Sequence, residues 1–568
     1  GGHVATIAAP QSERPFELAS APVWSSDSRY VAIIENDYGG TTRNLVARDR
    51  GGVSVIDYDE TPPAHQISSR ITIVDRQRPQ NPLHINVDDA VFDVDFGPDG
   101  TLYGARINNR VSEPSTELLA FNPTTGVSRT LYRTVGRFQA FTPRVSPDGA
   151  WIAGIVDADN RNWTDFASLI LVNVTTGEVR RLTSDLSVRE PIWARDGQEI
   201  YVLGRSGGLN QVWKVTLDGE MRQLTSDARR HFDTRTTIDG RYLAYQTEDG
   251  FGRRDVRVLD LESEIERVAY VVEEPATRFR LGEWRHIRWQ SRDGVRPYGH
   301  LFLPPDFDPS RRYPLIVDIH GGGPGSFLYL WAPFSMALNP GPLEWHAWAA
   351  MGYVVLSPDY RSTGDYGPEP VRSRRERGAY SPIDDADDAI SGVEYLIGQG
   401  YIDADRIAVI GHSAGGPRAY NAALARPDLF SALIVNEGVQ PDPLMGNIQM
   451  LSGTMTGGAF IGMMEQHFNG TLAETPERFI LNTTFEAARM DTPTLMMMGA
   501  QEHGGLGTQS WEVIYSLLRG RGTASRLLAF PDLGHNYTTP QSAVFAFEQA
   551  RDWLVTHDVS PGASRTGD

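Results

Sequence analysis

Ile407-Ala-Val-Ile-Gly-His-Ser-Ala-Gly-Gly416 is the stretch of sequence that decides the fold of this chain. Its first four residues are apolar without alternation, which predicts a strand buried on both faces of a parallel sheet. The segment 418–425 that follows resembles a helix. Glycines on both sides of Ser413 permit a sharp turn that lifts the serine hydroxyl above the sheet edge. Strand, turn and helix in this order predict a nucleophile elbow with Ser413 as the nucleophile; the alternative is a glycine-rich turn without chemistry.

The sequence around this turn alternates between buried strands and helices. Residues 383–400 have apolar side chains at helical spacing and end at Gly400, a suitable C-terminal cap. Alternating strands and helices imply a doubly wound, mostly parallel sheet. We therefore expect an α/β-hydrolase catalytic domain over residues 286–568. Its other strands are expected at 313–319, 353–356, 432–435, 494–498 and 527–530.

A serine nucleophile needs a general base, and the base needs an acid that orients it. In α/β-hydrolases the acid follows the nucleophile in the chain and the histidine follows the acid. His535 comes directly after the last expected strand and is the expected base, with His503 as the alternative. Glu502 is the only carboxylate in the loop after the preceding strand, and it is the expected acid. Asp532, three residues before His535, is the competing acid.

A second glycine-rich loop follows an early strand and reads His320-Gly-Gly-Gly-Pro-Gly325. Glycines let backbone N–H groups approach a substrate oxygen closely. We therefore expect an oxyanion hole formed by His320, Gly321 and Gly322, together with the N–H group of Ala414 next to the nucleophile. The alternative is a glycine-rich turn of structural use only.

The first half of the chain repeats an apolar or aromatic strand, a turn that contains aspartate, and a second strand. The turn aspartates lie at positions 27, 99, 148, 196 and 239, at intervals of 72, 49, 48 and 43 residues. Asp-Gly between alternating strands is a strong hairpin signal, because glycine supplies the positive φ that the turn requires. Hairpins repeated at this period predict a β-propeller domain over residues 1–285.

We expect six or seven blades. The long first interval could hold a cryptic blade, and residues 254–268 could supply another. Segments 174–185 and 215–227 are two matching hairpins that end in Leu-Thr-Ser-Asp, and they are expected to be equivalent outer strands. A β-sandwich with regular hairpins is the alternative fold.

Composition excludes several functions. The 568 residues include no cysteine, which excludes disulfides, thiolate zinc sites and a cysteine nucleophile. The net charge of −19 argues against nucleic acid as a partner, because phosphate binding needs clustered basic residues. Lys214 is the only lysine, so Schiff-base and Walker-lysine chemistry is excluded from almost the whole chain. We expect no cofactor, no metal and, since no run of 18 apolar residues occurs, no membrane span.

Taken together, these motifs resemble the prolyl oligopeptidase family of serine peptidases, in which a β-propeller precedes a C-terminal α/β-hydrolase domain. The resemblance covers nearly the whole chain and is most specific at residues 401–416, where Tyr-Ile-Asp-Ala-Asp-Arg-Ile leads into the turn. Residues 499–506 and 530–535 are similar to the acid loop and the histidine loop of the family. The resemblance implies a triad of Ser413, Glu502 and His535 and a propeller that admits only small peptides.

Residues 357–367 look like the Asn-x-Arg-Gly-Ser-x-Gly-Tyr-Gly stretch of the family, with Asp359 and Ser362 as departures. This stretch and the segment after the nucleophile are where the resemblance places the substrate. The residues expected to contact it are Tyr360, Arg361 and Val439.

Two departures from the family pattern narrow the range of expected substrates. Glu502 stands where the family nearly always has aspartate, and residues 439–446 lack the aromatic side chains that normally enclose a proline or small side chain. Both weaken a proline-specific or dipeptidyl activity. In having glutamate as its expected triad acid, the chain is similar to the bacterial lasso-peptide isopeptidases. These enzymes hydrolyse the isopeptide bond between a peptide's N-terminal amine and an Asp or Glu side chain. The arginine-rich, lysine-poor composition fits the GC-rich bacteria in which such enzymes are expected.

We therefore expect a soluble bacterial enzyme, cytoplasmic or periplasmic, whose substrate is a small peptide and most specifically a threaded lasso peptide. Three other functions stay open at this point. One is an acylaminoacyl- or oligopeptidase that acts on linear peptides, and another is a carboxylester hydrolase. The third is a propeller scaffold with a hydrolase domain that has lost its activity. The sequence does not choose an oligomeric state.

Overall fold

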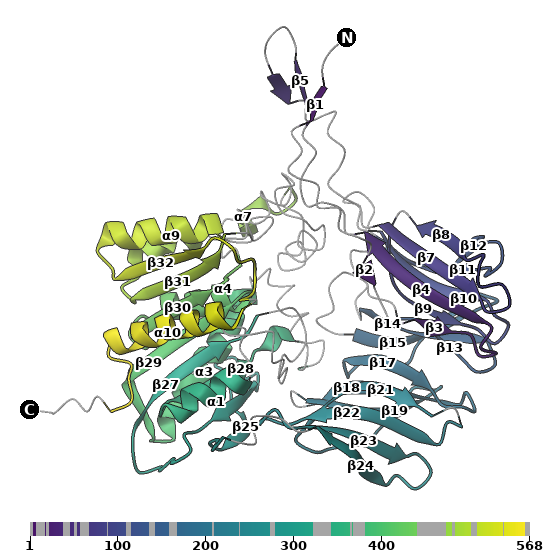
Figure 1. The fold of residues 1–568 in the computed structure, drawn as a ribbon. Coiled ribbons are helices and arrows are strands. Elements are labelled where there is room, and N and C mark those ends of the chain that lie inside the picture. The colour runs from purple at the N-terminus through teal and green to yellow at the C-terminus, as the bar shows by residue number, and fades with distance from the viewer. Residues whose placement is uncertain are drawn as a thin grey trace, which may run out of the picture.

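The computed structural model shows two domains side by side (Figure 1), an arc of antiparallel sheets and an α/β domain. The residues that it describes are 4–6, 17–18, 22–37, 46–49, 54–56, 68–87, 89–108, 115–135, 142–157, 167–206, 209–237, 239–272, 279–321, 342–363, 366, 381–439, 473–479, 483–500, 508–537 and 539–562.

Five blade-like sheets follow one another in the described part of the N-terminal half, and each is built from consecutive antiparallel strands. The first contains β2 (Glu17–Leu18), β3 (Val23–Trp24), β4 (Tyr30–Asp37), β7 (Ser68–Asp75) and β8 (Leu83–Val87). The second contains β9 (Ala90–Phe96), β10 (Leu102–Asn108), β11 (Ser115–Phe121) and β12 (Ser128–Val135). The third contains β13 (Arg144–Val145), β14 (Trp151–Asp157), β15 (Ala167–Asn173) and β16 (Val179–Arg181).

The last two blades repeat this pattern. The fourth contains β17 (Val188–Trp193), β18 (Glu199–Ser206), β19 (Leu209–Thr216) and β20 (Met221–Gln223). The fifth contains β21 (Arg230–Thr236), β22 (Tyr242–Glu248), β23 (Arg254–Asp260) and β24 (Glu266–Val272). The matching hairpins are β15–β16 and β19–β20, so the prediction of equivalent outer strands is confirmed. Separate sheets of this kind exclude the β-sandwich.

The blade count differs from the six or seven that we predicted, because the described residues form five. The long first interval is one blade with an insertion. Within it, β5 (Val46–Asp49) and β6 (Ser54–Ile56) pair with β1 (Val4–Thr6) in a separate small sheet. Residues 254–268 start no new blade, because β23 and β24 complete the fifth one.

The blades are held together by apolar clusters that each take side chains from two consecutive sheets. Tyr30 and Phe96, for example, stack at 6.3 Å between ring centroids across the first and second blades. The predicted Asp-Gly turns also form, with a φ of 81° at Gly100 and 69° at Gly197. The turns and the buried faces of the strands therefore specify the blades as the sequence indicated.

The C-terminal domain is an eight-stranded sheet in the order β25-β26-β28-β27-β29-β30-β31-β32. Its strands are β25 (Trp284–Arg288), β26 (Tyr298–Phe302), β27 (Tyr313–Ile319), β28 (Val354–Asp359), β29 (Ile402–His412), β30 (Ala432–Asn436), β31 (Thr494–Gly499) and β32 (Ser525–Phe530). The first two strands are antiparallel and the remaining pairs are parallel. Because β25 belongs to this sheet, the predicted boundary at residue 285 falls inside a strand, and the described domains meet between 272 and 284.

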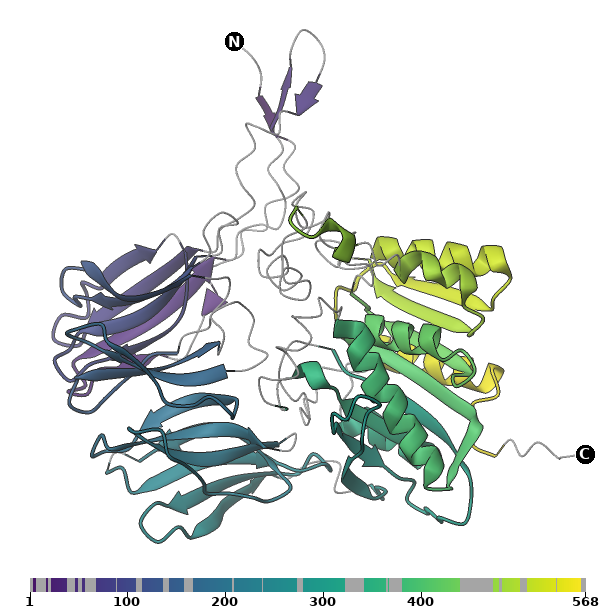
Figure 2. The same ribbon diagram turned by 180° about the vertical axis from the view of Figure 1, so that it is seen from behind.

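Helices cover both faces of the sheet (Figure 2). Successive residues of β27 point to opposite faces: Leu315 and Val317 pack in one apolar core, and Ile316 packs in the other. The helices are α1 (Pro342–Ala350), α3 (Ser381–Gly398), α4 (Gly415–Ala425), α7 (Pro476–Phe479), α8 (Thr483–Glu486), α9 (Thr508–Arg521) and α10 (Pro540–Thr556), with the 3-10 turns η3 (Arg361–Thr363) and η4 (Ala487–Arg489). None of the helices in the described part of the chain has the length and apolarity needed to cross a membrane.

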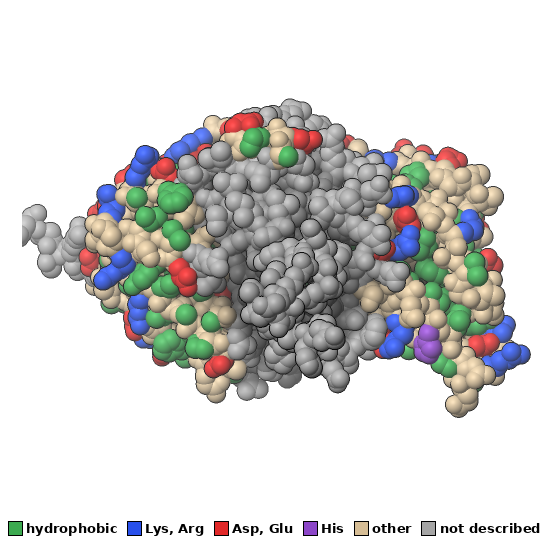
Figure 3. All heavy atoms as spheres, turned by 90° about the horizontal axis from the view of Figure 1, so that it is seen from above, with side chains coloured by type: hydrophobic (Ala, Val, Ile, Leu, Met, Phe, Trp, Pro, Cys, Tyr) green, Lys and Arg blue, Asp and Glu red, His purple; other side chains and the backbone are tan. Residues whose placement is uncertain are grey.

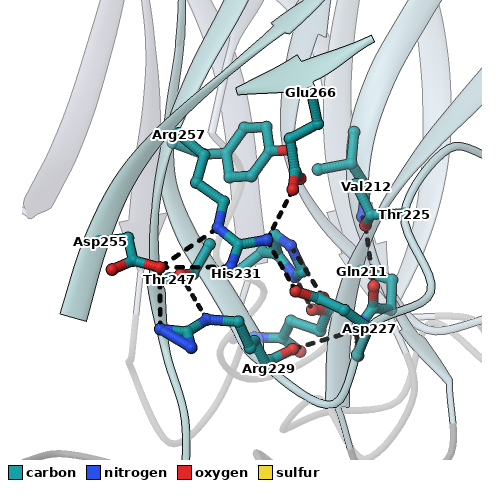
Figure 4. Close-up of polar contacts among 12 residues, drawn as sticks. Gln211, Val212, Thr225, Asp227, Arg229, His231, Thr247, Asp255, Arg257 and Glu266 are labelled. Carbon is teal, nitrogen blue, oxygen red and sulfur yellow. Dashed lines mark hydrogen bonds and ion pairs between the residues drawn. The ribbon is translucent and has the colours of Figure 1, made fainter. Parts of the chain in front are cut away.

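The fifth blade contacts the hydrolase domain through the turn between β22 and β23. Nε2 of His346 lies 3.0 Å from the Gly250 carbonyl oxygen, and the Phe251 ring stacks on the His346 ring. Arg229 holds this turn in place by pairing with Asp249 at 3.2 Å. Arg229 also pairs with Asp255 at 3.0 Å, within a network of charged side chains (Figure 4). The buried ion pairs of the blade therefore support the contact between the domains.

The molecule viewed from above has basic and acidic side chains interspersed around both domains (Figure 3). Among the coloured, described side chains of this face, the acidic residues are therefore not gathered into one patch.

Candidate active site

Ser413 lies in the turn between β29 and α4 with a φ of 52°, a conformation that L-residues rarely adopt. The glycines two residues before and two residues after Ser413 are required for steric reasons. A Cβ atom on Gly415 would lie 1.9 Å from the Ile319 carbonyl oxygen, and one on Gly411 would lie 2.3 Å from the Gly415 carbonyl oxygen. The structure therefore forms the sharp nucleophile elbow that the sequence predicted.

His535 lies in the loop after β32, and its Nε2 atom is 2.7 Å from Ser413 Oγ. This is a hydrogen bond between groups from the ends of two different strands. When the serine hydroxyl donates to Nε2, the imidazole is neutral and carries its proton on Nδ1. A serine polarised by a neutral imidazole is an activated nucleophile.

The predicted acid and its rival histidine, Glu502 and His503, lie outside the described residues. The competing acid Asp532 is described, and it is exposed on the turn after β32. An acid that orients a catalytic histidine is normally buried beside the ring. The position of Asp532 therefore favours an acid from another loop.

The expected oxyanion hole is described in part. Ala414 is the N-cap residue of α4, so its N–H group lies at the positive end of the helix next to the nucleophile. Gly321 packs against the serine, because a Cβ atom on Gly321 would lie 2.5 Å from Ser413 Cβ. The backbones of the two expected donor loops are thus adjacent, while Gly322 lies outside the described residues.

His320 turns its side chain away from the nucleophile. Its Nδ1 lies 2.9 Å from the Gly321 carbonyl oxygen, and its ring stacks on Tyr360 at 4.7 Å between centroids. The Tyr360 hydroxyl donates to the His320 carbonyl oxygen at 3.0 Å and is buried. Tyr360 therefore supports the oxyanion loop from behind, which differs from the substrate contact that the resemblance implied.

Arg361 is likewise engaged inside the protein. Its guanidinium pairs with Asp388 at 2.5 Å and also with Asp293, and the residue is 5% exposed. Through these bonds, Arg361 fixes the chain at the end of β28 to helix α3. Val439, the third expected contact residue, is half-buried and its N–H group donates to the Ser413 carbonyl oxygen at 3.0 Å, so it lies directly beside the nucleophile.

A second buried ion pair supports the elbow, and the sequence analysis missed it. Arg418 on α4 pairs with Asp385 on α3 at 2.8 Å and also donates to the Ala414 carbonyl oxygen at 2.5 Å. Ser362 donates to the same carboxylate at 2.6 Å. The available signal was the placement of Asp385 and Asp388 on the apolar face of the helix predicted over 383–400, where a charge needs a partner.

His412, the residue before the nucleophile, is buried beside His535, with 5.4 Å between ring centroids. Burial and the nearby His535 lower the pKa of His412 to about 3, so its ring is neutral at physiological pH. Its Nδ1 lies 3.3 Å from the amide nitrogen of Asn436, and the Asn436 amide oxygen accepts the Tyr537 hydroxyl. His535 therefore packs on a neutral, hydrogen-bonded layer.

Among the described residues, no group of histidine and carboxylate side chains could hold a metal ion.

Residues 342–558 match the family model described as the prolyl oligopeptidase family. These residues make up most of the hydrolase domain, which is therefore similar to the prolyl oligopeptidase family. Dipeptidyl-peptidase 5 of Porphyromonas gingivalis is 24% identical over 500 residues, which are 82% of this chain and 66% of that protein. The acylamino-acid-releasing enzyme of Sus scrofa is 24% identical over 279 residues, 48% of this chain and 35% of that protein. The chain thus spans less than two thirds of the length of these curated relatives.

Solved structures share the fold of both domains. The acylaminoacyl peptidase of Pyrococcus horikoshii matches with a TM-score of 0.71 and 16% identity, over 97% of this chain and 83% of that chain. Dipeptidyl peptidase 4 of Porphyromonas gingivalis matches with a TM-score of 0.66 and 16% identity, over 94% of this chain and 74% of that chain. The expected arrangement of a propeller before an α/β-hydrolase domain is confirmed.

Proposed function

We propose that this chain is a serine peptidase that hydrolyses small peptides through an acyl-enzyme. The hydrogen bond between Ser413 Oγ and His535 Nε2 in a strained elbow is the observation that carries the proposal. The fold and the similarity of the hydrolase domain to the prolyl oligopeptidase family support it, and so does the similarity of the chain to dipeptidyl-peptidase 5.

The proposed reaction has two steps. His535 takes the Ser413 proton as Oγ attacks the carbonyl carbon of the scissile amide, and the N–H groups of Ala414 and the loop after His320 stabilise the oxyanion. His535 then gives this proton to the departing amine as the carbon–nitrogen bond breaks. Water, activated by the same imidazole, releases the acid and restores the serine.

Glu502 is the acid that we propose for His535. Its loop follows β31, which lies between β30 and β32 in the sheet and so ends beside the histidine loop. Glu502→Gln keeps the shape of the side chain but removes the charge that stabilises the imidazolium. We expect Glu502→Gln to lose most of the activity and Asp532→Asn to retain it. The reverse result would assign the role to Asp532.

The finer proposal concerns the substrate and is an isopeptidase that opens a threaded lasso peptide. It is supported by the glutamate in the acid loop and by the lack of aromatic residues over 439–446. The alternative is cleavage of linear peptides, and the relatives named dipeptidyl-peptidase 5 and acylamino-acid-releasing enzyme favour it.

One experiment separates these activities. The purified enzyme is incubated with a threaded lasso peptide, with its linear form, with an aminoacyl amide and with a p-nitrophenyl ester, and Ser413→Ala is the control in each case. Isopeptidase activity predicts a gain in mass of one water molecule on the threaded peptide alone. Cleavage of the linear peptides without this gain would contradict the isopeptidase and retain the peptidase. Hydrolysis of the ester alone would indicate a carboxylester hydrolase.

A further inference from the structure

Glu437 lies directly after β30, at the point where three loops of the site meet. It is fully buried, with 0% exposure, and its φ is 47°. A glutamate in this left-handed conformation costs roughly 1 kcal/mol or more relative to glycine, so the surrounding contacts must hold it there. Those contacts reach both the nucleophile and the acid loop.

The side chain of Glu437 is bonded to the start of the acid loop. Its Oε2 atom accepts the N–H group of Gly499 at 2.8 Å, across 62 residues of chain. The backbone N–H group of Glu437 donates to the Met497 carbonyl oxygen, also at 2.8 Å. Gly499 is the last residue of β31, so this carboxylate holds the end of the strand, three residues before Glu502 in the sequence.

Asn436 and Val439, which flank Glu437 in the chain, hydrogen-bond to the backbone of the nucleophile. The Asn436 carbonyl oxygen accepts the N–H group of Ser413 at 3.0 Å, and the Val439 N–H group donates to the Ser413 carbonyl oxygen at 3.0 Å. Both bonds bind the backbone of the strained residue itself. A four-residue segment thus joins the elbow to the acid loop through one side chain.

The same point is packed against the histidine loop. A Cβ atom on Gly499 would lie 2.1 Å from the Gly534 carbonyl oxygen, one residue before His535. Ala500, which follows Gly499, donates its N–H group to the Phe530 carbonyl oxygen at 2.9 Å. A shift of Gly499 would therefore be transmitted to the catalytic histidine as well.

We propose that Glu437 is a positioning residue that fixes the acid loop relative to Ser413 and His535. The inference rests on the proposed triad, in which the acid must lie close enough to the imidazole to hold its tautomer. Misplacement of a catalytic group by about 1 Å can cost roughly 100-fold in rate. Glu437 itself does not touch the substrate.

Two variants of similar length isolate the bond to Gly499. Glu437→Gln keeps an oxygen acceptor for the Gly499 N–H group, whereas Glu437→Met removes it, and both keep the same backbone conformation. We expect Glu437→Met to lower kcat, counted per active serine, by roughly 10- to 100-fold with little change in KM. We expect Glu437→Gln to stay within about threefold of the wild type, because the hydrogen bond survives.

The pH profile distinguishes positioning from general damage. A carboxylate beside His535 raises the pKa of the imidazole, so its displacement should move the acid limb of kcat/KM to lower pH. Partial unfolding would reduce the number of active sites but leave this limb in place. If Glu437→Met does not fold, Glu437→Gly replaces it, because glycine accepts the positive φ and also lacks the acceptor.

The control is Glu264→Met, since Glu264 has a φ of 56° in an exposed turn of the fifth blade and should leave kcat unchanged. Wild-type kcat and an unmoved acid limb in Glu437→Met would overturn the inference, as would equal losses in the Met and Gln variants. A wild-type enzyme that neither cleaves any peptide nor reacts with a fluorophosphonate would instead overturn the proposed function.

Discussion

His535 Nε2 and Ser413 Oγ meet at 2.7 Å although the two residues are 122 positions apart in the chain. The distance is that of a formed hydrogen bond, so the path for proton transfer exists before any substrate is present. This hydrogen bond depends on two separate structural features. The strained turn raises the Ser413 hydroxyl, and the loop after β32 places the His535 imidazole over it.

Removal of either partner should abolish hydrolysis. We expect Ser413→Ala and His535→Ala each to lower kcat by several powers of ten, because nucleophile and base act as one unit. The measurement is peptide cleavage followed by mass spectrometry, with circular dichroism to check the fold. A fluorophosphonate should label the wild type and not Ser413→Ala, and should label His535→Ala far more slowly. Wild-type cleavage by Ser413→Ala would place the nucleophile elsewhere.

Gly321 should tolerate no side chain, for a reason that is steric and local. The methyl group of Gly321→Ala would lie 2.5 Å from Ser413 Cβ and 2.7 Å from the His412 carbonyl oxygen, so the oxyanion loop must move. Loss of one oxyanion donor typically costs 100- to 1000-fold in kcat, and we expect a loss of about that order.

The matched control for this substitution is Gly398→Ala. A Cβ atom at Gly398, near the end of α3, would meet no atom within 4 Å. Gly398→Ala should leave kcat unchanged and be neutral or slightly stabilising, since alanine has a higher helix propensity than glycine. Equal activity of the two variants would show that Gly321 does not form part of the oxyanion loop.

The sequence predicted the parts of the fold and the site that rest on local signals. Glycines mark the elbow at Ser413, and short continuous apolar runs mark the buried strands of the hydrolase sheet, so both could be located from the sequence alone. The 72-residue interval misled the blade count because an insertion and an additional blade have the same length in sequence.

Contacts between distant segments could not be predicted in this way. Glu437 has no local pattern that reveals its bond to Gly499, because that bond depends on how β30 and β31 lie in the sheet. Arg361 looked like a substrate ligand by resemblance, and only the folded chain shows that Asp388 and Asp293 occupy its guanidinium.

Arg257 should be important for the stability of the fifth blade. Its guanidinium lies among three carboxylates (Figure 4), those of Glu266 at 2.6 Å, Asp227 at 2.9 Å and Asp255 at 3.2 Å. Arg257→Met would leave Glu266 and Asp227 without this cation, while Asp255 keeps its pair with Arg229. We expect the substitution to lower the free energy of unfolding by roughly 2 kcal/mol, since the two carboxylates are partly exposed.

The comparison for this variant is Arg267→Met on the exposed face of β24, which should change stability by less than about 0.5 kcal/mol. Urea denaturation followed by tryptophan fluorescence measures both variants. If they unfold at the same urea concentration, the network of Arg257 contributes no more than a surface charge.

Buried His412 should make the hydrolase domain sensitive to acid. Burial and the nearby His535 lower its pKa to about 3 in the folded chain, whereas an exposed histidine titrates near 6.5. As the pH falls below about 6.5, the unfolded chain takes up a proton that the folded chain does not bind until about pH 3. The free energy of unfolding therefore falls over this window, by about 2 kcal/mol between pH 7 and 5 for this one group.

His412→Phe tests this linkage, because it removes the titrating group and keeps a buried ring. The variant should lose less stability than the wild type between pH 7 and 5, and the difference between the two losses should be about 2 kcal/mol. This difference is independent of how much the substitution itself destabilises the fold, since each protein is compared with itself at two pH values. His286, His300 and His346 also have pKa values lowered chiefly by burial, so the wild type and the variant should both retain an acid dependence. Equal losses in the two proteins would mean that the folded chain accommodates a charged His412, and the neutral layer beneath His535 would then be wrong.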